Sequence, residues 1–378
     1  MMPCRPALTA GALALIARLA LIRWVPTNYS FDGYQRWAGR DNILVHDWLP
    51  ATQVVIWLTH KSGGGIVMTK VLLALIASLA CLAATQVIAK MGGRAAAWFF
   101  LPITLFSPFL AWSVVPYQEG TFLLGLFGSI ALALPKDDGT PQSGRRLLAA
   151  DCLAGSVALI RYEGWPFVLL YLLWRRRPAA ITALWGIAVW LTLKLGWQVQ
   201  GSAPTPTDFA DWNDLGQRFS WNRTLNSLQK LGKQMISSGA WGLAPIGLMG
   251  LWQALRTATP VAQLLALTLA AQVCALAGWL VGLETATYRM QVIPMVFLGV
   301  FASLWAGRQW KTRPKLGLAL AVAALAGSLF FIHHAKWMAN RSARSARWEQ
   351  TLVETMQKCS LDTQEPCQWW ITPRKNLG

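Results

Sequence analysis

Residues 66–89 read IVMTKVLLALIASLACLAATQVIA, and Lys70 is the single charged side chain in this run. The run exceeds the roughly 20 apolar residues that a helix needs to cross a bilayer. The glycine-rich stretch at 62–65 (SGGG) precedes it and breaks the chain. Lys90 and Arg94 follow it. This pattern predicts a transmembrane helix with a turn at one end and basic residues at the other.

The composition extends this prediction to the whole chain. Of the 378 residues, 54% are hydrophobic and only 13% are charged, whereas a soluble protein has roughly a quarter of charged residues. The net charge is +18, but many of the basic residues lie in short loops, where they set membrane topology and meet anionic lipid. We therefore expect an all-α polytopic membrane protein, with membrane lipid and not nucleic acid as a partner.

Apolar runs of this kind recur along the sequence. They predict helices at about 7–25, 95–114, 121–134, 179–198, 240–255, 260–282, 290–307 and 315–332. Together with helix 66–89 and two further segments within 147–174, they give a bundle of about eleven membrane-embedded segments. Arg18, inside the first helix, should face the bundle or reach the interface, because a charge in lipid is costly.

The basic loops define a cytoplasmic side, which leaves three polar regions on the outer side. These are a first loop at 26–65, a second at 199–238 and a C-terminal tail at 333–378, which follows a membrane module at 1–332. Apolar residues between Trp48 and Leu58 are too few to cross the membrane and predict an interfacial helix. In the tail, Cys359 and Cys367 would form a disulfide only in an oxidising compartment.

The run at 147–174 allows two interpretations. As a single span, it would bury Arg161 and Glu163 in mid-membrane and place the basic residues 175–177 on the outer side, against the positive-inside rule. As two short helices that meet near Arg161, it returns these basic residues to the cytoplasm. The second interpretation is favoured, because half-length helices are tolerated where they line a site.

In this topology, polar residues of both signs gather at the outer ends of the helices, which is less expected than another basic loop. They are Asp32, Arg36, His46, Asp47, Glu119, Arg161, Glu163, Lys194, Glu284 and Arg289. Carboxylates suit the deprotonation of a hydroxyl acceptor, and cations suit a phosphate leaving group. The sequence therefore predicts one outer cavity that these side chains surround.

The order of these features resembles that of the C-type (GT-C) membrane glycosyltransferases, which use polyprenyl-phosphate sugars. Asp32-Gly33-Tyr34 and Trp48-Leu49-Pro50 fit the acid-bearing first loop of that superfamily. The likeness to its GPI-mannosyltransferase-like and protein-mannosyltransferase-like members covers most of residues 1–310. It includes three further elements: Ser107-Pro108 with Tyr117-Gln118-Glu119-Gly120 at a helix turn, Arg161-Tyr162-Glu163-Gly164 at an Arg-bearing membrane turn, and Tyr288-Arg289 before Pro294 at an outer edge.

The resemblance implies an inverting transfer of a sugar, with mannose favoured, from a polyprenyl-phosphate donor to a hydroxyl acceptor that is lipid-linked or a small glycan. Asp32 is the expected general base. The expected ligands of the donor phosphate are Arg289, Arg161 and Lys194, and the expected substrate-binding residues are Arg36, His46, Asp47, Glu119, Tyr162, Glu163 and Tyr288. Many members have two adjacent acids in the first loop, whereas Gly33 follows Asp32 here. We therefore predict no metal ligands and leave a divalent metal open.

Other interpretations use the same residues. Asp32 could be an ordinary loop carboxylate, Glu119 could simply end a helix, and Arg161 and Glu163 could form a structural ion pair. The rival functions are a transporter or flippase of a lipid-linked substrate, a lipid-linked glycan ligase or polymerase, and a non-catalytic membrane scaffold. The expected location is the inner membrane of a bacterium with the site facing the periplasm, as part of the cell-envelope machinery, or the ER membrane in a eukaryote.

Overall fold

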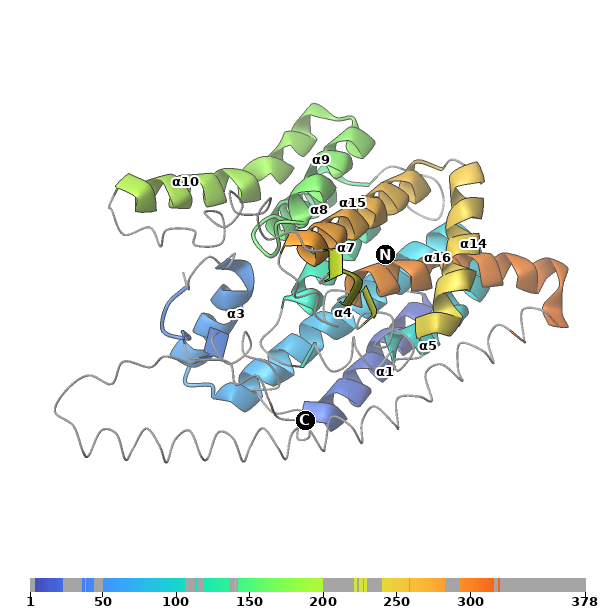
Figure 1. Cartoon of the computed structure of the whole chain (residues 1–378), viewed down its shortest axis with the longest axis horizontal. Coiled ribbons are helices and arrows are strands. Elements are labelled where there is room, and N and C mark those ends of the chain that lie inside the picture. Colours follow the sequence, from blue (N-terminus) through green and yellow to red (C-terminus); the bar gives the residue numbers. More distant parts are fainter. Residues whose placement is uncertain are drawn as a thin grey trace.

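The computed structural model shows a bundle of helices, and within the residues it describes every regular element is helical (Figure 1). It describes residues 4–22, 36–37, 39–43, 50–105, 113–114, 118–135, 140, 142–199, 221–222, 224–226, 228–229, 240–257, 259–282, 292–315 and 319. The predicted helix at 315–332, the tail at 333–378 and its two cysteines lie almost wholly outside these residues, as does most of the loop at 199–238.

The first elements follow the predicted order. Helix α1 spans Arg5–Ile22, the interfacial segment forms α3 at Pro50–Lys61, and α4 spans Ile66–Phe99. The predicted break between α3 and α4 is present, and Gly63 adopts a φ of 81°, which a residue with a Cβ rarely takes. Arg18 is fully buried, and its Nε donates to Ser113 Oγ at 2.7 Å. Arg18 therefore faces the interior of the bundle, which is one of the two positions predicted for it, the other being the membrane interface.

The third predicted helix, 95–114, differs from what the structure shows. Helix α4 is interrupted by a kink at the non-helical Gly93 (φ 82°, ψ 178°), so a second helical segment does begin close to the predicted residue 95, but it ends at Phe99. A short helix α5, Leu101–Thr104, then starts with proline in its first turn. Ser113 lies in a turn and not in a helix. Pro102 explains the division, because a proline cannot donate the backbone hydrogen bond that would continue α4.

The run at 147–174 forms two antiparallel helices, as the favoured interpretation predicted. Helix α7 spans Glu119–Ala133 and is followed by α8 at Gly144–Val157 and α9 at Gly164–Arg175. Asp151, in the middle of α8, accepts hydrogen bonds from Tyr171 Oη at 2.9 Å and from Arg175 Nε at 3.3 Å, both in the second half of α9. Arg175, the last residue of α9, therefore packs against the middle of α8, on the side away from the turn that joins the two helices.

The remaining described elements complete the bundle. They are a 3₁₀ helix η2 at Pro178–Leu184, α10 at Trp185–Val199, α14 at Ala240–Thr257, α15 at Pro260–Gly282 and α16 at Val292–Thr312. Figure 1 shows α3 and α10 at one side of the bundle and α14 at the other. The positions of α14, α15 and α16 agree with the predicted ranges, whereas the predicted helix at 179–198 is divided into η2 and α10. The number of about eleven membrane segments stays a prediction.

Helix α4 is the centre of the core, with α1, α7 and α16 packed against it. Small residues allow close approach: a Cβ added to Gly120 of α7 would lie 2.8 Å from the Cβ of Ala77 in α4. Among the described residues, four helical stretches are long and apolar enough to cross a membrane: Arg5–Ile22, Ile66–Phe99, Pro260–Ala277 and Val292–Thr312. These stretches agree with an integral membrane protein.

Candidate functional site

A buried group of charges lies where α7 begins and the α8–α9 turn ends. Arg161 Nη1 is 3.1 Å from Glu119 Oε1, and Arg161 Nη2 is 2.7 Å from Glu163 Oε1. Arg161 Nε also donates to Glu163 Oε2 at 3.2 Å, which makes this second pair bidentate. The three side chains are 6%, 0% and 12% exposed, in the order Arg161, Glu119, Glu163. We call these three residues the charge cluster.

The charge cluster lies deep in the bundle. Gly120, next to Glu119, packs on Ala77, which is eleven residues into α4 and therefore about 17 Å from its first residue. On the other side, Gln272, near the middle of α15, donates its Nε2 to the backbone carbonyl oxygen of Glu163 at 3.0 Å. Charges at this depth are expensive unless they line a polar site.

The local fold of the α8–α9 turn explains how Arg161 and Glu163 come to point at the same place. After α8 ends at Val157, the backbone N–H of Arg161 donates to the carbonyl of Val157 at 3.3 Å, and that of Gly164 donates to Arg161 O at 2.9 Å. A Cβ on Gly164 would lie 2.5 Å from Val157 O, so only glycine allows α9 to start this close to the end of α8. The two short helices thus meet in a tight turn that presents both charges.

Parts of the first loop attach to residues that neighbour the charge cluster in sequence. Arg36, which is 2% exposed, donates from Nη2 to Gln118 Oε1 at 2.8 Å, next to Glu119 in sequence. Gln53 of α3 donates its Nε2 to the carbonyl oxygen of Arg36 at 3.0 Å. The N–H of Ala51 donates to Leu159 O at 3.0 Å, so the start of α3 is fixed to the α8–α9 turn. Both described portions of the loop therefore converge on one region.

Aromatic rings surround the same turn. The ring centroids of Tyr162, Trp165 and Trp190 are 5.4–6.0 Å apart in all three pairings. Trp165 Nε1 donates to Ala158 O at 3.1 Å, which fixes the indole against the turn. Tyr162 is 37% exposed. Helix α10, which carries Trp190, is thereby held beside the charge cluster.

The three side chains of the charge cluster carry one formal positive and two formal negative charges, so their formal sum is −1. Arg161 is therefore already engaged by carboxylates. Buried carboxylates held by a fixed guanidinium can accept hydrogen bonds from hydroxyl groups, and the cation reduces the cost of their burial. Within the part of the chain that the structure describes, no group of three or more His, Cys, Asp or Glu residues could hold a metal ion.

The structure brings together five of the predicted site residues: Arg36, Glu119, Arg161, Tyr162 and Glu163. For Lys194, it describes the backbone in α10 but not the side chain. The others lie outside the described residues: Asp32, His46, Asp47, Glu284, Tyr288 and Arg289. The prediction that Arg161 binds the donor phosphate stays a prediction, and its observed partners are two carboxylates.

Sequence reasoning missed the residues that position the charged ones. They are Gln53, Gln118, Trp190 and Gln272. A glutamine inside a long apolar run, such as Gln272, is a usable signal, because a buried amide needs a hydrogen-bond partner. Nothing in the sequence pattern identified Gln53 or Trp190.

Comparison with known proteins bears on the fold. No family model matches the chain, and no curated protein matches it either. Its structure is similar to the crystal structure of ArnT from Cupriavidus metallidurans in the apo state, with a TM-score of 0.54 and 14% sequence identity over 89% of this chain and 76% of that one. At this identity the likeness concerns the fold. The likeness supports the predicted all-helical fold, and membership of the GT-C superfamily stays a prediction.

Proposed function

We propose that the protein is a membrane glycosyltransferase that moves a sugar from a polyprenyl-phosphate donor to a hydroxyl acceptor at the outer side of the membrane. The observation that carries the proposal is the charge cluster, buried deep inside a fold that resembles ArnT. A solely structural bundle gains little by burying three charges in this way, since apolar side chains of similar size are often as stable. Ionisable residues inside a membrane bundle, in contrast, commonly mark the path or binding site of a substrate.

Asp32 is the proposed general base. It precedes Arg36 by four residues, so the covalent chain keeps their Cα atoms within about 14 Å of each other. Arg36 is bonded to Gln118, beside Glu119. This connection supports a position of Asp32 near the charge cluster. In the proposed reaction, Asp32 accepts the proton of the acceptor hydroxyl as its oxygen attacks the anomeric carbon and the lipid phosphate leaves, which inverts the configuration.

Arg289 is the proposed principal ligand of the leaving phosphate, with Lys194 beside it. The ring centroids of Phe127 and Phe297 are 5.5 Å apart, and counting back along α7 and α16 places Val292 within about 5 Å of the level of Glu119. Arg289 precedes Val292 by three residues, which supports its reaching the same region. Lys194 follows Trp190 by one helical turn.

In this mechanism the charge cluster has a different role from that of Arg289. Arg161 holds Glu119 and Glu163 in place, and their carboxylate oxygens accept hydrogen bonds from sugar or acceptor hydroxyls. Direct binding of the donor phosphate by Arg161 stays a proposal, and it would use N–H groups of the guanidinium other than the three that donate to these carboxylates. His46, Asp47 and Tyr288 remain proposed substrate contacts, as do Arg36 and Tyr162.

The test is a transfer assay. The purified protein is incubated with a panel of radiolabelled polyprenyl-phosphate sugars and a mixture of lipid-linked and small glycan acceptors, and the wild type is compared with Asp32→Asn. Asp41→Asn is the matched control, because Asp41 is an exposed acid of the same loop. We expect Asp32→Asn to lose at least about 100-fold in transfer rate, the usual contribution of general base catalysis. Donor binding and the activity of Asp41→Asn should be retained.

Three outcomes have different meanings. Transfer by the wild type that is lost in Asp32→Asn alone supports both the class of reaction and the base, and the active donor identifies the sugar. Transfer that survives in Asp32→Asn keeps the enzyme class and rejects the base. If no sugar donor of the panel binds, the glycosyltransferase proposal is rejected.

A further inference from the structure

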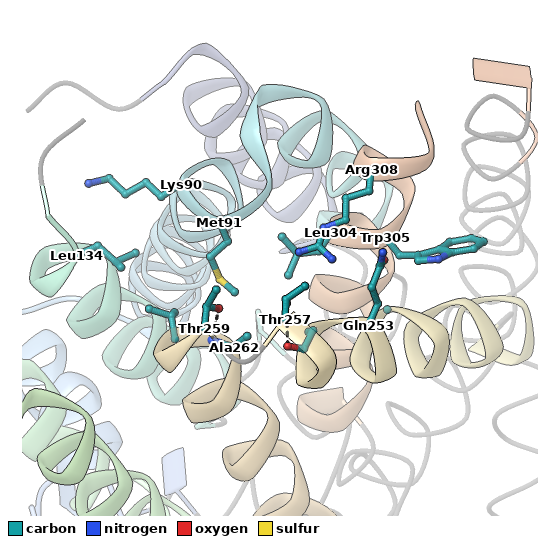
Figure 2. A pocket seen from close by; sticks show the side chains of 13 residues that line it. Lys90, Met91, Leu134, Gln253, Thr257, Thr259, Ala262, Leu304, Trp305 and Arg308 are labelled. Atoms are coloured by element: carbon teal, nitrogen blue, oxygen red, sulfur yellow. Dashed lines mark hydrogen bonds between the residues drawn. The ribbon is translucent and has the colours of Figure 1, made fainter. Parts of the chain in front are cut away.

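A separate cavity of about 220 Å³ lies at the other end of the bundle, among α4, α14, α15 and α16 (Figure 2). Lys90 of α4 lies in its wall, and the Nζ of this residue donates to Pro135 O at the far end of α7 from Glu119. The cavity is thus separated from the charge cluster by most of the length of α7. We call it the basic-end pocket.

The polar groups of the basic-end pocket suit an anion. Figure 2 shows the side chain of Arg308 directed into the space, whereas Lys90 extends away from it. Among the residues that the structure describes, the guanidinium of Arg308 makes no ion pair or hydrogen bond. Thr259 and Ala262 stand at the start of the 23-residue helix α15, and the N–H of Ala262 donates to Thr259 Oγ1 at 3.3 Å. The positive end of this helix therefore faces the same pocket.

The pocket contains a hydrogen-bond acceptor as well. Gln253 Oε1 is buried and has no hydrogen-bond partner in the described part of the chain. A buried carbonyl oxygen of this kind needs a donor, such as a ligand hydroxyl. The four helices that form most of the wall contain no Asp or Glu in their described ranges, so no acidic side chain of these helices repels an anion.

Apolar side chains complete the lining. Met91, Val261 and Leu304 are among the apolar residues that line the pocket with Arg308. The volume is below the roughly 300–1,000 Å³ of pockets for drug-sized ligands, so a headgroup fits and a whole lipid does not. A guanidinium beside apolar surface between transmembrane helices, at the basic and hence cytoplasmic end, matches the features of anionic lipid sites.

We infer that the basic-end pocket binds the headgroup of an anionic phospholipid of the cytoplasmic leaflet, with a phosphodiester on Arg308 and the start of α15, and a headgroup hydroxyl on Gln253. Phosphatidylglycerol has both groups, whereas phosphatidylcholine has neither the net charge nor the hydroxyl. The acyl chains run along the apolar side of the pocket toward the bilayer. This inference concerns lipid binding alone and does not depend on the proposed transfer reaction.

The experiment is native mass spectrometry of the intact protein in mild detergent, titrated with phosphatidylglycerol or phosphatidylcholine. Arg308→Gln should weaken phosphatidylglycerol binding about fivefold, the effect of one basic residue at a lipid headgroup. Thr257→Glu places a negative charge on an exposed residue of the pocket wall and should weaken binding at least as much. Arg256→Gln is the control: Arg256 lies on the same helix but stacks on Trp252 at 4.6 Å and does not line the pocket.

Each possible result of the titration either supports the inference or overturns it. Preferential binding of phosphatidylglycerol that Arg308→Gln and Thr257→Glu reduce, and Arg256→Gln does not, supports the inference. Equal binding of the two lipids, or an equal loss in Arg256→Gln, overturns it in favour of a general surface charge effect. Displacement of the lipid by inorganic phosphate alone also overturns it, because the pocket is then a simple anion site. If Arg308→Gln does not fold, Thr257→Glu decides the question.

Discussion

The two ends of α7 show two ways of placing charge in a membrane bundle. At its start, Glu119 is bound to Arg161, which also holds Glu163, so charges of opposite sign satisfy one another while buried. Near its end, the basic-end pocket has Arg308 directed into an open space with no acid in the helices around it. The first arrangement depends on residues brought together from distant parts of the sequence, whereas the second follows from topology, since basic residues collect on the cytoplasmic side.

We therefore expect substitutions in the charge cluster to change the stability of the fold, and substitutions in the basic-end pocket to change ligand binding. Removing Arg161 leaves carboxylates buried without their counter-charge, so the free energy of unfolding of the whole bundle should decrease. Removing Arg308 leaves no buried charge without a partner, so it should lower the affinity for a bound ligand and leave the stability of the fold unchanged. Four predictions test or sharpen this contrast.

The largest effect is expected for Arg161→Met. Breaking a buried ion pair by removing one partner costs about 3–5 kcal/mol, so the melting temperature in detergent should fall steeply. Arg308→Gln, measured in the same detergent without phosphatidylglycerol, should leave it almost unchanged. Adding Glu119→Gln and Glu163→Gln to Arg161→Met should restore most of the stability but no transfer activity. Equal melting temperatures for Arg161→Met and Arg308→Gln would abolish the contrast.

The next effect concerns the turn that forms the charge cluster. Gly164→Ala forces a Cβ to within 2.5 Å of Val157 O, so α9 must move away from α8 at a cost of about 1–3 kcal/mol. Gly144→Ala is the matched control at the start of α8, where a Cβ would meet nothing within 4 Å. Thermal unfolding of both variants checks this. A neutral Gly164→Ala would mean that the turn tolerates a wider separation of the two helices.

A smaller effect is expected at α15. Gln272→Leu removes the hydrogen bond from Nε2 to Glu163 O and should lower the free energy of unfolding by about 1 kcal/mol. Gln263→Leu changes an exposed residue of the same helix and should be neutral. The transfer assay gives a second comparison, because a displaced Glu163 should raise the KM for substrate more than it lowers kcat. If the two leucine variants behave alike, Gln272 does not position Glu163.

The smallest effect is expected at the exposed end of the first loop. Asp41 Oδ1 is 3.2 Å from both Lys61 Nζ and His60 Nε2, and the hydrogen bond from Lys61 lowers the pKa of Asp41. Such a surface pair contributes little. Any stability it adds is present above the ordinary pKa of Asp and is lost as the pH falls through the lowered pKa. Melting curves of wild type and Asp41→Asn should therefore nearly coincide at neutral pH and merge in acid.

The candidate site was predictable in kind but not in arrangement. Charged residues inside apolar runs are conspicuous in a membrane protein, so Arg161, Glu163 and Glu119 could be selected from the sequence. Their pairing could not, because Glu119 and Arg161 are 42 residues apart and nothing local dictates that they meet. The same limit explains why Gln53 and Gln272 were missed, since each acts through a backbone oxygen that the sequence does not reveal.

The sequence by itself determined that this protein is a helical membrane bundle, where most of its helices lie and which end is basic. Those properties follow from local hydrophobicity and from the distribution of Lys and Arg, which need no long-range information. Only the tertiary structure decided that the helix after Gly93 ends at Phe99, that Gln118 anchors Arg36, and that Arg161 binds two carboxylates. These features depend on how closely helices approach one another, which packing at residues such as Gly120 and Gly164 controls.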